Sequence, residues 1–162
     1  MIGMKSKLVD LIKKQKDNFP LDQSFYIDKD IYDIDLKNIF FNQWIFVGHE
    51  SRIPKKGDYF LFNVGNESII VIRGNNQKVN CFYNVCRHRG SHICLEKEGK
   101  KNKLICPYHS WVYDLEGNLI KARMMPENFN KDEWGLNKCN SKNFEGLIFI
   151  NLSDKPDSFD DF

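Results

Sequence analysis

The chain has little of what marks a membrane, secreted or nucleic-acid-binding protein. Its 162 residues contain 24 Lys and Arg against 22 Asp and Glu, so the formal net charge is only +2. That charge cannot supply the attraction on which non-specific nucleic-acid binding depends. No apolar run reaches the length of a signal-peptide core or a membrane span. We therefore expect a cytoplasmic protein with no nucleic-acid partner and no membrane partner.

Histidine is also scarce, and the cysteines are odd in number, with 4 His and 5 Cys in the chain. Because cytoplasmic thiols stay reduced, five cysteines predict metal ligands or small buried residues rather than disulfides. Their distribution is uneven. The stretch CRHRGSHICLEKEGKKNKLICPYHSW, residues 86–111, holds three cysteines and three histidines.

The length allows one domain with a short extension. Residues 6–17 carry Leu and Ile at helical spacing among lysines, which predicts an amphipathic helix that packs on the protein rather than on a membrane. A second helical pattern begins at Asp30, a candidate N-cap, and ends near Trp44. We therefore expect an N-terminal helical extension over residues 1–43.

From Trp44 onward the sequence consists of short β-rich runs: WIFVG, DYFLFNVG, SIIVIRG, VNCFYNV, KLICPY, SWVYDL and EGLIFINL. Turn sequences such as Gly65-Asn66 and Gly117-Asn118 separate several of them, at the spacing typical of antiparallel sandwiches and small barrels. The charged stretch at 96–103 predicts a solvated loop. The fold class we expect is mainly β, an antiparallel β-sandwich over residues 44–152.

Two Cys–His pairs stand out in residues 86–111. Cys86-x-His88 and Cys106-x-x-His109 are separated by 17 residues, and each pair lies in a loop or at a strand end. Two such loops can converge on one metal site. Zinc accepts two thiolates and two imidazoles, but zinc modules usually open with two nearby cysteines and put His on a helix. The alternative is a two-iron, two-sulfide cluster with cysteines on one iron and histidines on the other.

The motifs CRHRG and CPYHSW resemble the two cluster-binding loops of Rieske non-haem iron oxygenases, in the large subunit. The resemblance extends through WIFVGHESRIPKKGDYF, MPENFNKDEWGL and EGLIFINL, and covers about residues 22–155. It implies a Rieske-type [2Fe-2S] cluster in a small cluster-binding subdomain. Cys86 and Cys106 would ligate one iron, and His88 and His109 the other.

The second loop departs from the family pattern, which usually has Gly after its His. Here Ser110 follows His109, which leaves ligation untouched but alters hydrogen bonding or backbone shape. The respiratory-chain relatives also tie their loops with a disulfide, and the corresponding positions here are Ser91 and Tyr108. The resemblance therefore favours the oxygenase branch.

The remaining cysteines and histidines have simpler explanations. Because four ligands complete the cluster, we expect His92 and Cys94 to have packing or surface roles. Cys81 and Cys139 lie in apolar strand contexts and are expected to be small buried residues. His49 has no partner at ligand spacing and is expected to be a hydrogen-bonded structural residue.

Four residues beside the ligands allow two interpretations each. The charges of Arg87 and Arg89 either favour the reduced, more negative cluster or pair with carboxylates elsewhere. Tyr108 and Trp111 either shield the cluster from water or fill the core.

The resemblance also implies a second site, a mononuclear Fe(II) held by two histidines and a carboxylate in a C-terminal domain. Once two histidines are assigned to the cluster, only His49 and His92 remain, and they cannot form this triad. We therefore expect an oxidoreductase by family that is inactive alone, with residues 153–162 starting a linker to an absent catalytic domain. The implied partners are a reductase or ferredoxin donor and the catalytic domain of the same or a neighbouring subunit in a homo-oligomer, commonly a trimer.

Three functions stay open at this point. The first is electron transfer as a fragment of an oxygenase large subunit. The stretches CPYHSWVYDLEGNL and MPENFNKDEWGL resemble the oxygenase branch that demethylates glycine betaine and related quaternary ammonium compounds more than the branch that dihydroxylates aromatic rings. A stand-alone Rieske ferredoxin-like carrier is the second function, although such ferredoxins begin close to their first strand. A zinc-stabilised β module is the third.

Overall fold

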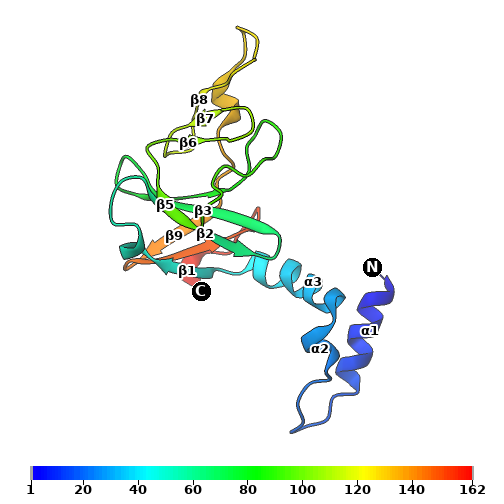
Figure 1. The fold of residues 1–162 in the computed structure, drawn as a ribbon. Coiled ribbons are helices and arrows are strands. Elements are labelled where there is room, and N and C mark those ends of the chain that lie inside the picture. Colours follow the sequence, from blue (N-terminus) through cyan, green and yellow to red (C-terminus); the bar gives the residue numbers. More distant parts are fainter. Residues whose placement is uncertain (1, 162) are drawn as a thin grey trace. The chain divides into compact units, whose positions relative to one another are not determined.

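The computed structural model describes residues 2–161, with side chains from residue 7 onward. Contacts between residues divide the chain into two units, one ending at Asn42 and one beginning at Gln43, and each is described by itself. Figure 1 labels most of their helices and strands. Over the described range, no helix is long and apolar enough to cross a membrane.

The first unit is helical. It contains α1 (Ile2–Lys13), α2 (Ser24–Ile27), α3 (Lys29–Asn38) and a 3-10 turn, Phe40–Asn42. The predicted N-cap at Asp30 is wrong, because the carboxylate of Asp28 accepts the backbone N–H groups of Asp30, at 2.9 Å, and Ile31, at 3.4 Å. Asp28 has the extended backbone that an N-cap requires, whereas Asp30 is already helical.

The second unit contains three antiparallel sheets within the described residues, which confirms the mainly β fold class (Figure 1). The first sheet has the order β1 (Ile45–His49), β10 (Leu147–Asn151), β9 (Asn140–Phe144). The second has the order β4 (Val79–Tyr83), β3 (Glu67–Arg73), β2 (Asp58–Val64), β5 (Glu98–Lys100). The third has the order β6 (Leu104–Ile105), β7 (Val112–Tyr113), β8 (Leu119–Lys121).

The predicted loop at 96–103 is partly wrong, because β5 lies within it. Glu98 to Lys100 pair with Asp58 to Phe60 at the edge of the second sheet, and all three β5 residues are exposed. An exposed edge strand carries charged side chains that discourage pairing with other chains, so it lacks the apolar alternation of an inner strand. β9 was missed for the same reason, since all five of its residues are exposed.

Strand β3 separates two hydrophobic cores. Ile69 and Val71 pack in the core between the first and second sheets, while Ile70 and Ile72 pack in the core between the second and third. Successive side chains of a strand point to opposite faces, so the unbroken apolar run of β3 belongs to a strand buried on both sides. The core between the second and third sheets contains Cys86 and Cys106, one from each predicted cluster-binding loop.

The two cysteines and the histidine that lie outside these loops, and that we did not expect to be ligands, behave as expected. Cys81 and Cys139 are buried in the core between the first two sheets, and burial raises the pKa of each thiol to about 12. His49 is hydrogen bonded, because its Nδ1 accepts the backbone N–H of Ser51 at 3.1 Å. Neither observation suggests a ligand.

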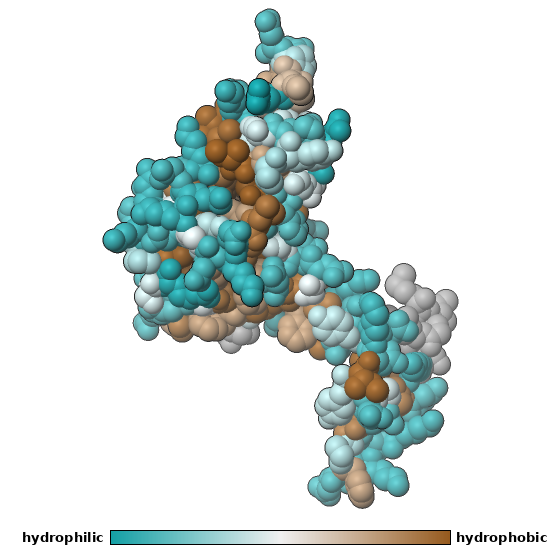
Figure 2. Space-filling model, viewed as in Figure 1, coloured by the Kyte–Doolittle hydropathy of each residue, from teal (hydrophilic) through white to brown (hydrophobic). Residues whose placement is uncertain are grey.

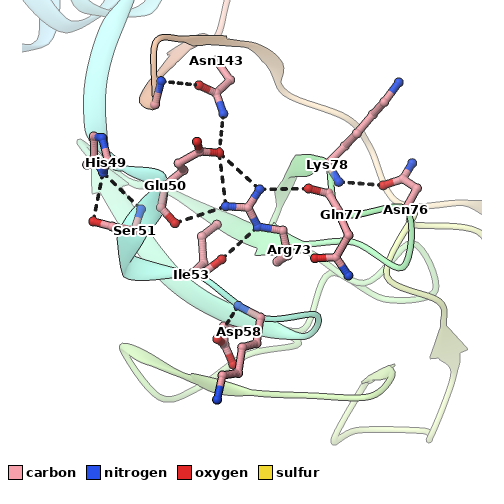
Figure 3. Close-up of polar contacts among 12 residues, drawn as sticks. His49, Glu50, Ser51, Ile53, Asp58, Arg73, Asn76, Gln77, Lys78 and Asn143 are labelled. Atoms are coloured by element: carbon pink, nitrogen blue, oxygen red, sulfur yellow. Dashed lines mark hydrogen bonds and ion pairs between the residues drawn. The ribbon is translucent and has the colours of Figure 1, made fainter.

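A network of hydrogen bonds around Arg73 lies near the start of the second unit (Figure 3). The guanidinium of Arg73, at the end of β3, donates to both the carboxylate of Glu50, at 3.2 Å, and the carbonyl of Ile53, at 2.9 Å. Asn143 of β9 donates to the same Glu50 carboxylate at 2.9 Å. Asn143 and Arg73 together lower the pKa of Glu50 below its usual range, with Asn143 the larger cause. The network ties the first sheet to the second.

Candidate metal centre

The two predicted cluster-binding loops have the same backbone. In the first loop, which follows β4, Cys86 N–H donates to Ser91 O at 2.8 Å and Gly90 N–H donates to Cys86 O at 3.0 Å. In the second, between β6 and β7, Cys106 N–H donates to Trp111 O at 2.9 Å and Ser110 N–H donates to Cys106 O at 3.0 Å. Each loop is therefore a closed six-residue turn that begins at its cysteine.

The fifth residue of each turn has a left-handed backbone. Gly90 has φ of +73° and Ser110 has φ of +57°. Only glycine adopts this region without a steric penalty from its side chain. Ser110, which stands where the family usually has glycine, therefore keeps the backbone conformation that glycine favours, and this causes local strain.

The turns bring the four predicted ligands together in pairs. Cys86 and Cys106 are both 2% exposed and belong to the same hydrophobic core. The imidazole rings of His88 and His109 are in contact, with centroids 4.6 Å apart and planes at 72°. Within residues 2–161, no three His, Cys, Asp or Glu side chains converge on a site for a single metal ion.

The ring nitrogens of this pair suit metal ligation. The Nδ1 atoms of His88 and His109 are buried and have no hydrogen-bond partner in the structure. Buried polar atoms are rarely left unpaired, so an unpaired imidazole nitrogen is explained by a missing ion or cofactor. Burial lowers the pKa of His88, and the neighbouring His109 and Arg89 lower it further. The neutral imidazole that results is the form that binds metal.

Burial raises the pKa of the Cys86 thiol, while a contact with Tyr113 lowers it. The Tyr113 hydroxyl lies 3.3 Å from Cys86 Sγ and accepts the backbone N–H of Arg87 at 3.2 Å. A thiolate can only accept, so in the ligated state the hydroxyl donates to sulfur. Sequence reasoning missed Tyr113. The alternation in SWVYD, which puts Tyr113 on the same side as Trp111, was the available signal.

Asn84 fixes the chain that leaves the first loop, and sequence reasoning missed it too. It is fully buried, and its Oδ1 accepts the N–H groups of Ile93, at 3.0 Å, and Cys94, at 2.9 Å. Its Nδ2 donates to Cys94 O at 2.8 Å and Ser68 Oγ at 3.3 Å. A polar side chain with every hydrogen bond satisfied specifies one loop conformation.

The aromatic neighbours lie differently. Trp111 is fully buried and stacks on His88, with centroids 4.7 Å apart and planes at 9°. It therefore both fills the core and covers a predicted ligand. Tyr108 is 60% exposed and its ring lies 3.8 Å from that of His109, so it covers this histidine on the solvent side.

The other residues of the stretch lie at the surface or in the core. Arg87 and Arg89 are exposed, and neither forms an ion pair with a carboxylate of the described chain, so the pairing interpretation is wrong here. Arg87 lies 6.0 Å from the ring centre of Trp134. His92 is exposed, whereas Cys94 is buried and burial raises its pKa to about 11.

Comparison with known proteins identifies the family. Residues 43–139 match the Rieske [2Fe-2S] domain model, which is more than half of the chain. The chain therefore belongs to the family of Rieske [2Fe-2S] domains. Its cofactor is a Rieske-type cluster, which sets the zinc module aside, and the two thiols and two imidazoles of the turns fit that cofactor.

The relatives are oxygenase subunits. The chain is 40% identical over 154 residues to the glycine betaine monooxygenase oxygenase subunit of Pseudomonas aeruginosa, which covers 94% of this chain and 36% of the relative. It is 36% identical over 145 residues to the benzene 1,2-dioxygenase subunit alpha of Pseudomonas putida, covering 88% of this chain and 32% of the relative. The chain thus spans about a third of the length of these relatives.

Two solved structures have the same fold. The quaternary ammonium Rieske monooxygenase CntA matches with a TM-score of 0.77 and 34% identity, over 85% of this chain and 39% of that one. Naphthalene 1,2-dioxygenase from Rhodococcus matches with a TM-score of 0.83 and 29% identity, over 98% of this chain and 36% of that one.

Proposed function

We propose that the four residues of the two turns ligate the cluster, Cys86 and Cys106 on one iron and His88 and His109 on the other. The proposal is supported by the two thiols buried in the same core and by the two buried Nδ1 atoms that lack partners. When bound, the cluster accepts and releases one electron at a potential that its imidazole ligands raise. The protein orients the ligands through the two turns, excludes water with Trp111, and donates a hydrogen bond from Tyr113 to a ligand sulfur.

We propose that the chain acts as the electron-delivering part of an oxygenase large subunit whose substrate is a quaternary ammonium compound such as glycine betaine. The observation that carries this is the 40% identity to a glycine betaine monooxygenase subunit over 94% of the chain. A fragment of an aromatic-ring dioxygenase is the second candidate, and the match to naphthalene 1,2-dioxygenase over 98% of the chain favours it. A stand-alone carrier is less favoured, because that match includes the helical unit.

The partners follow from this role. We propose a reductase or ferredoxin as electron donor and, as acceptor, a mononuclear iron in the catalytic domain of the same or a neighbouring subunit, within a homo-oligomer such as a trimer. Inter-subunit electron transfer is named for the related CntA. Tyr108 in the second loop is exposed, as are the apolar residues Ile105, just before that loop, and Leu95, after the first loop. Figure 2 shows a hydrophobic band on the surface of this unit. None of the five cysteines forms a disulfide, which suits the cytoplasm, and we propose the cytoplasm as the compartment.

Cluster ligation is tested by two matched substitutions. Cys106→Ser should abolish the absorption and electron paramagnetic resonance signals of the cluster, because it removes a thiolate ligand. Cys94→Ser changes an equally buried cysteine that ligates nothing, so the signals should persist. Iron and sulfide counts accompany both variants. Loss of the signals in Cys94→Ser, or their survival in Cys106→Ser, would refute the ligand set.

The oxygenase role is tested by the coding DNA downstream of Phe162. We expect a segment in frame, or a neighbouring gene, that encodes two histidines and a carboxylate for mononuclear iron. The joined protein is then assayed for release of formaldehyde from glycine betaine, with benzene as the competing substrate class. Oxidation of benzene alone would favour the dioxygenase. Absence of any such coding segment would favour the stand-alone carrier.

A further inference from the structure

Three buried polar side-chain atoms of the described chain have no hydrogen-bond partner, and they lie together. They are the Nδ1 atoms of His88 and His109 and the indole Nε1 of Trp111. The indole stacks on His88, with centroids 4.7 Å apart, and the two imidazoles are in contact. The three unpaired atoms therefore describe one site rather than three unrelated defects.

The third atom differs in chemistry from the other two. A neutral imidazole nitrogen can bind iron, so ligation explains His88 and His109. The indole nitrogen of Trp111 carries a hydrogen and can only donate, so it cannot be a ligand. A fully buried indole N–H normally finds an acceptor. Because no described residue supplies a conventional acceptor, we look for the acceptor in what the site binds.

We propose that the indole N–H of Trp111 donates a hydrogen bond to an inorganic sulfide of the cluster. This inference rests on the proposed ligation by the two turns. The sulfides are the anionic acceptors that a Rieske cluster brings to the imidazole on which Trp111 stacks. Trp111 is then a tuning residue that acts directly on the cofactor, in addition to its packing role.

The consequence is a higher reduction potential. The reduced cluster carries one more negative charge, so a donor to sulfide stabilises it more than the oxidised cluster. Loss of one such hydrogen bond should lower the equilibrium constant for reduction by up to about tenfold, which is about 59 mV for a one-electron couple.

The direct test is spectroscopic. Protein labelled with ¹⁵N in the indole of tryptophan is reduced, and the hyperfine coupling of ¹⁵N to the cluster electron spin is measured. We expect a weak indole coupling in the natural chain that is lost in Trp111→Phe and kept in Trp134→Phe and Trp44→Phe. Trp134 is a close control, because its ring contacts Trp111 with centroids 5.8 Å apart.

A second measurement separates the N–H from the bulk of the ring. Site-specific replacement of Trp111 by 3-benzothienylalanine exchanges the N–H for sulfur and keeps the ring, so the cluster should assemble and its potential should fall as in Trp111→Phe. An unchanged potential in the benzothienyl protein would overturn the inference. So would the absence of indole coupling, which would mean that the N–H meets a water molecule or the ring of Phe129 or Trp134.

Failure of this inference differs from failure of the proposed function. A natural chain without cluster absorption and resonance would sink the proposed ligation, and the hydrogen bond with it. A normal cluster spectrum without ¹⁵N coupling sinks the hydrogen bond alone.

Discussion

The two predicted cluster-binding loops share a backbone conformation and differ in how the protein supports them. Each turn starts at a cysteine, closes with the same two backbone hydrogen bonds, and reverses through a left-handed fifth residue. In the first loop the fifth residue is Gly90, the Tyr113 hydroxyl lies beside the Cys86 sulfur, and Asn84 fixes the chain that leaves the loop. In the second loop the fifth residue is Ser110. The first turn is therefore held in part by side chains outside it, whereas the second is held mainly by its own backbone hydrogen bonds.

The largest expected effect comes from the support that only the first loop has. Asn84→Ala removes four hydrogen bonds and leaves the N–H groups of Ile93 and Cys94 buried without partners. We expect a loss of about 3 kcal/mol in the free energy of unfolding and a lower iron content. Denaturant unfolding and iron analysis measure both. Asn140→Ala, at an exposed asparagine, is the control, and an equal loss there would contradict the special role of Asn84.

The fifth residues can be exchanged to test the strain. Gly90→Ser adds a side chain where no atom lies within 4 Å, so the change costs only the left-handed backbone, about 1 kcal/mol. The reverse change, Ser110→Gly, should stabilise the protein by about 0.5 kcal/mol, because part of the relief is offset by the freer unfolded chain. Denaturant midpoints report both values. The same sign for both substitutions would show that the loops are not equivalent in backbone strain.

The smallest effect concerns the sulfur of the first loop. Tyr113→Phe removes the hydroxyl that lies 3.3 Å from Cys86 Sγ and keeps the ring. We expect the reduction potential to fall by about 20–40 mV, because a donor to sulfur stabilises the reduced cluster. Voltammetry measures the shift. Tyr59→Phe, at a buried tyrosine whose hydroxyl lies 3.4 Å from Glu96 O, is the comparison and should leave the potential unchanged.

The sequence allowed the two loops and the β fold to be predicted, since ligand spacing and strand alternation are local patterns. The supports could not be predicted in the same way. Tyr113 reaches a cysteine 27 residues earlier, and Asn84 bonds residues 9 and 10 positions later, so both depend on how strands assemble. The sequence showed that Ser110 replaces the usual glycine. Only the structure showed the reason for that glycine, which is the left-handed backbone at this position.

Strands β5 and β9 escaped prediction for a different reason. Both lie at sheet edges with every residue exposed, so neither contributes an apolar face that a pattern could reveal. The N-cap of α3 was misplaced by two residues, because Asp28 and Asp30 are chemically identical candidates and only the backbone distinguishes them. Element types were thus predictable where burial is strong, and bounds were not.

The two ends of β4 respond differently to acid. At Val79, its first residue, β4 pairs with Arg73, whose charge is matched by Glu50. The folded protein lowers the pKa of Glu50, so this pairing stabilises the fold above the ordinary glutamate pKa and fades as the pH falls through the lowered value. Just beyond the other end of β4 lies Asn84, whose amide side chain does not titrate in acid. Acid therefore weakens the Glu50–Arg73 pair at the end of β4 that is remote from the cysteines, and leaves the hydrogen bonds of Asn84 intact.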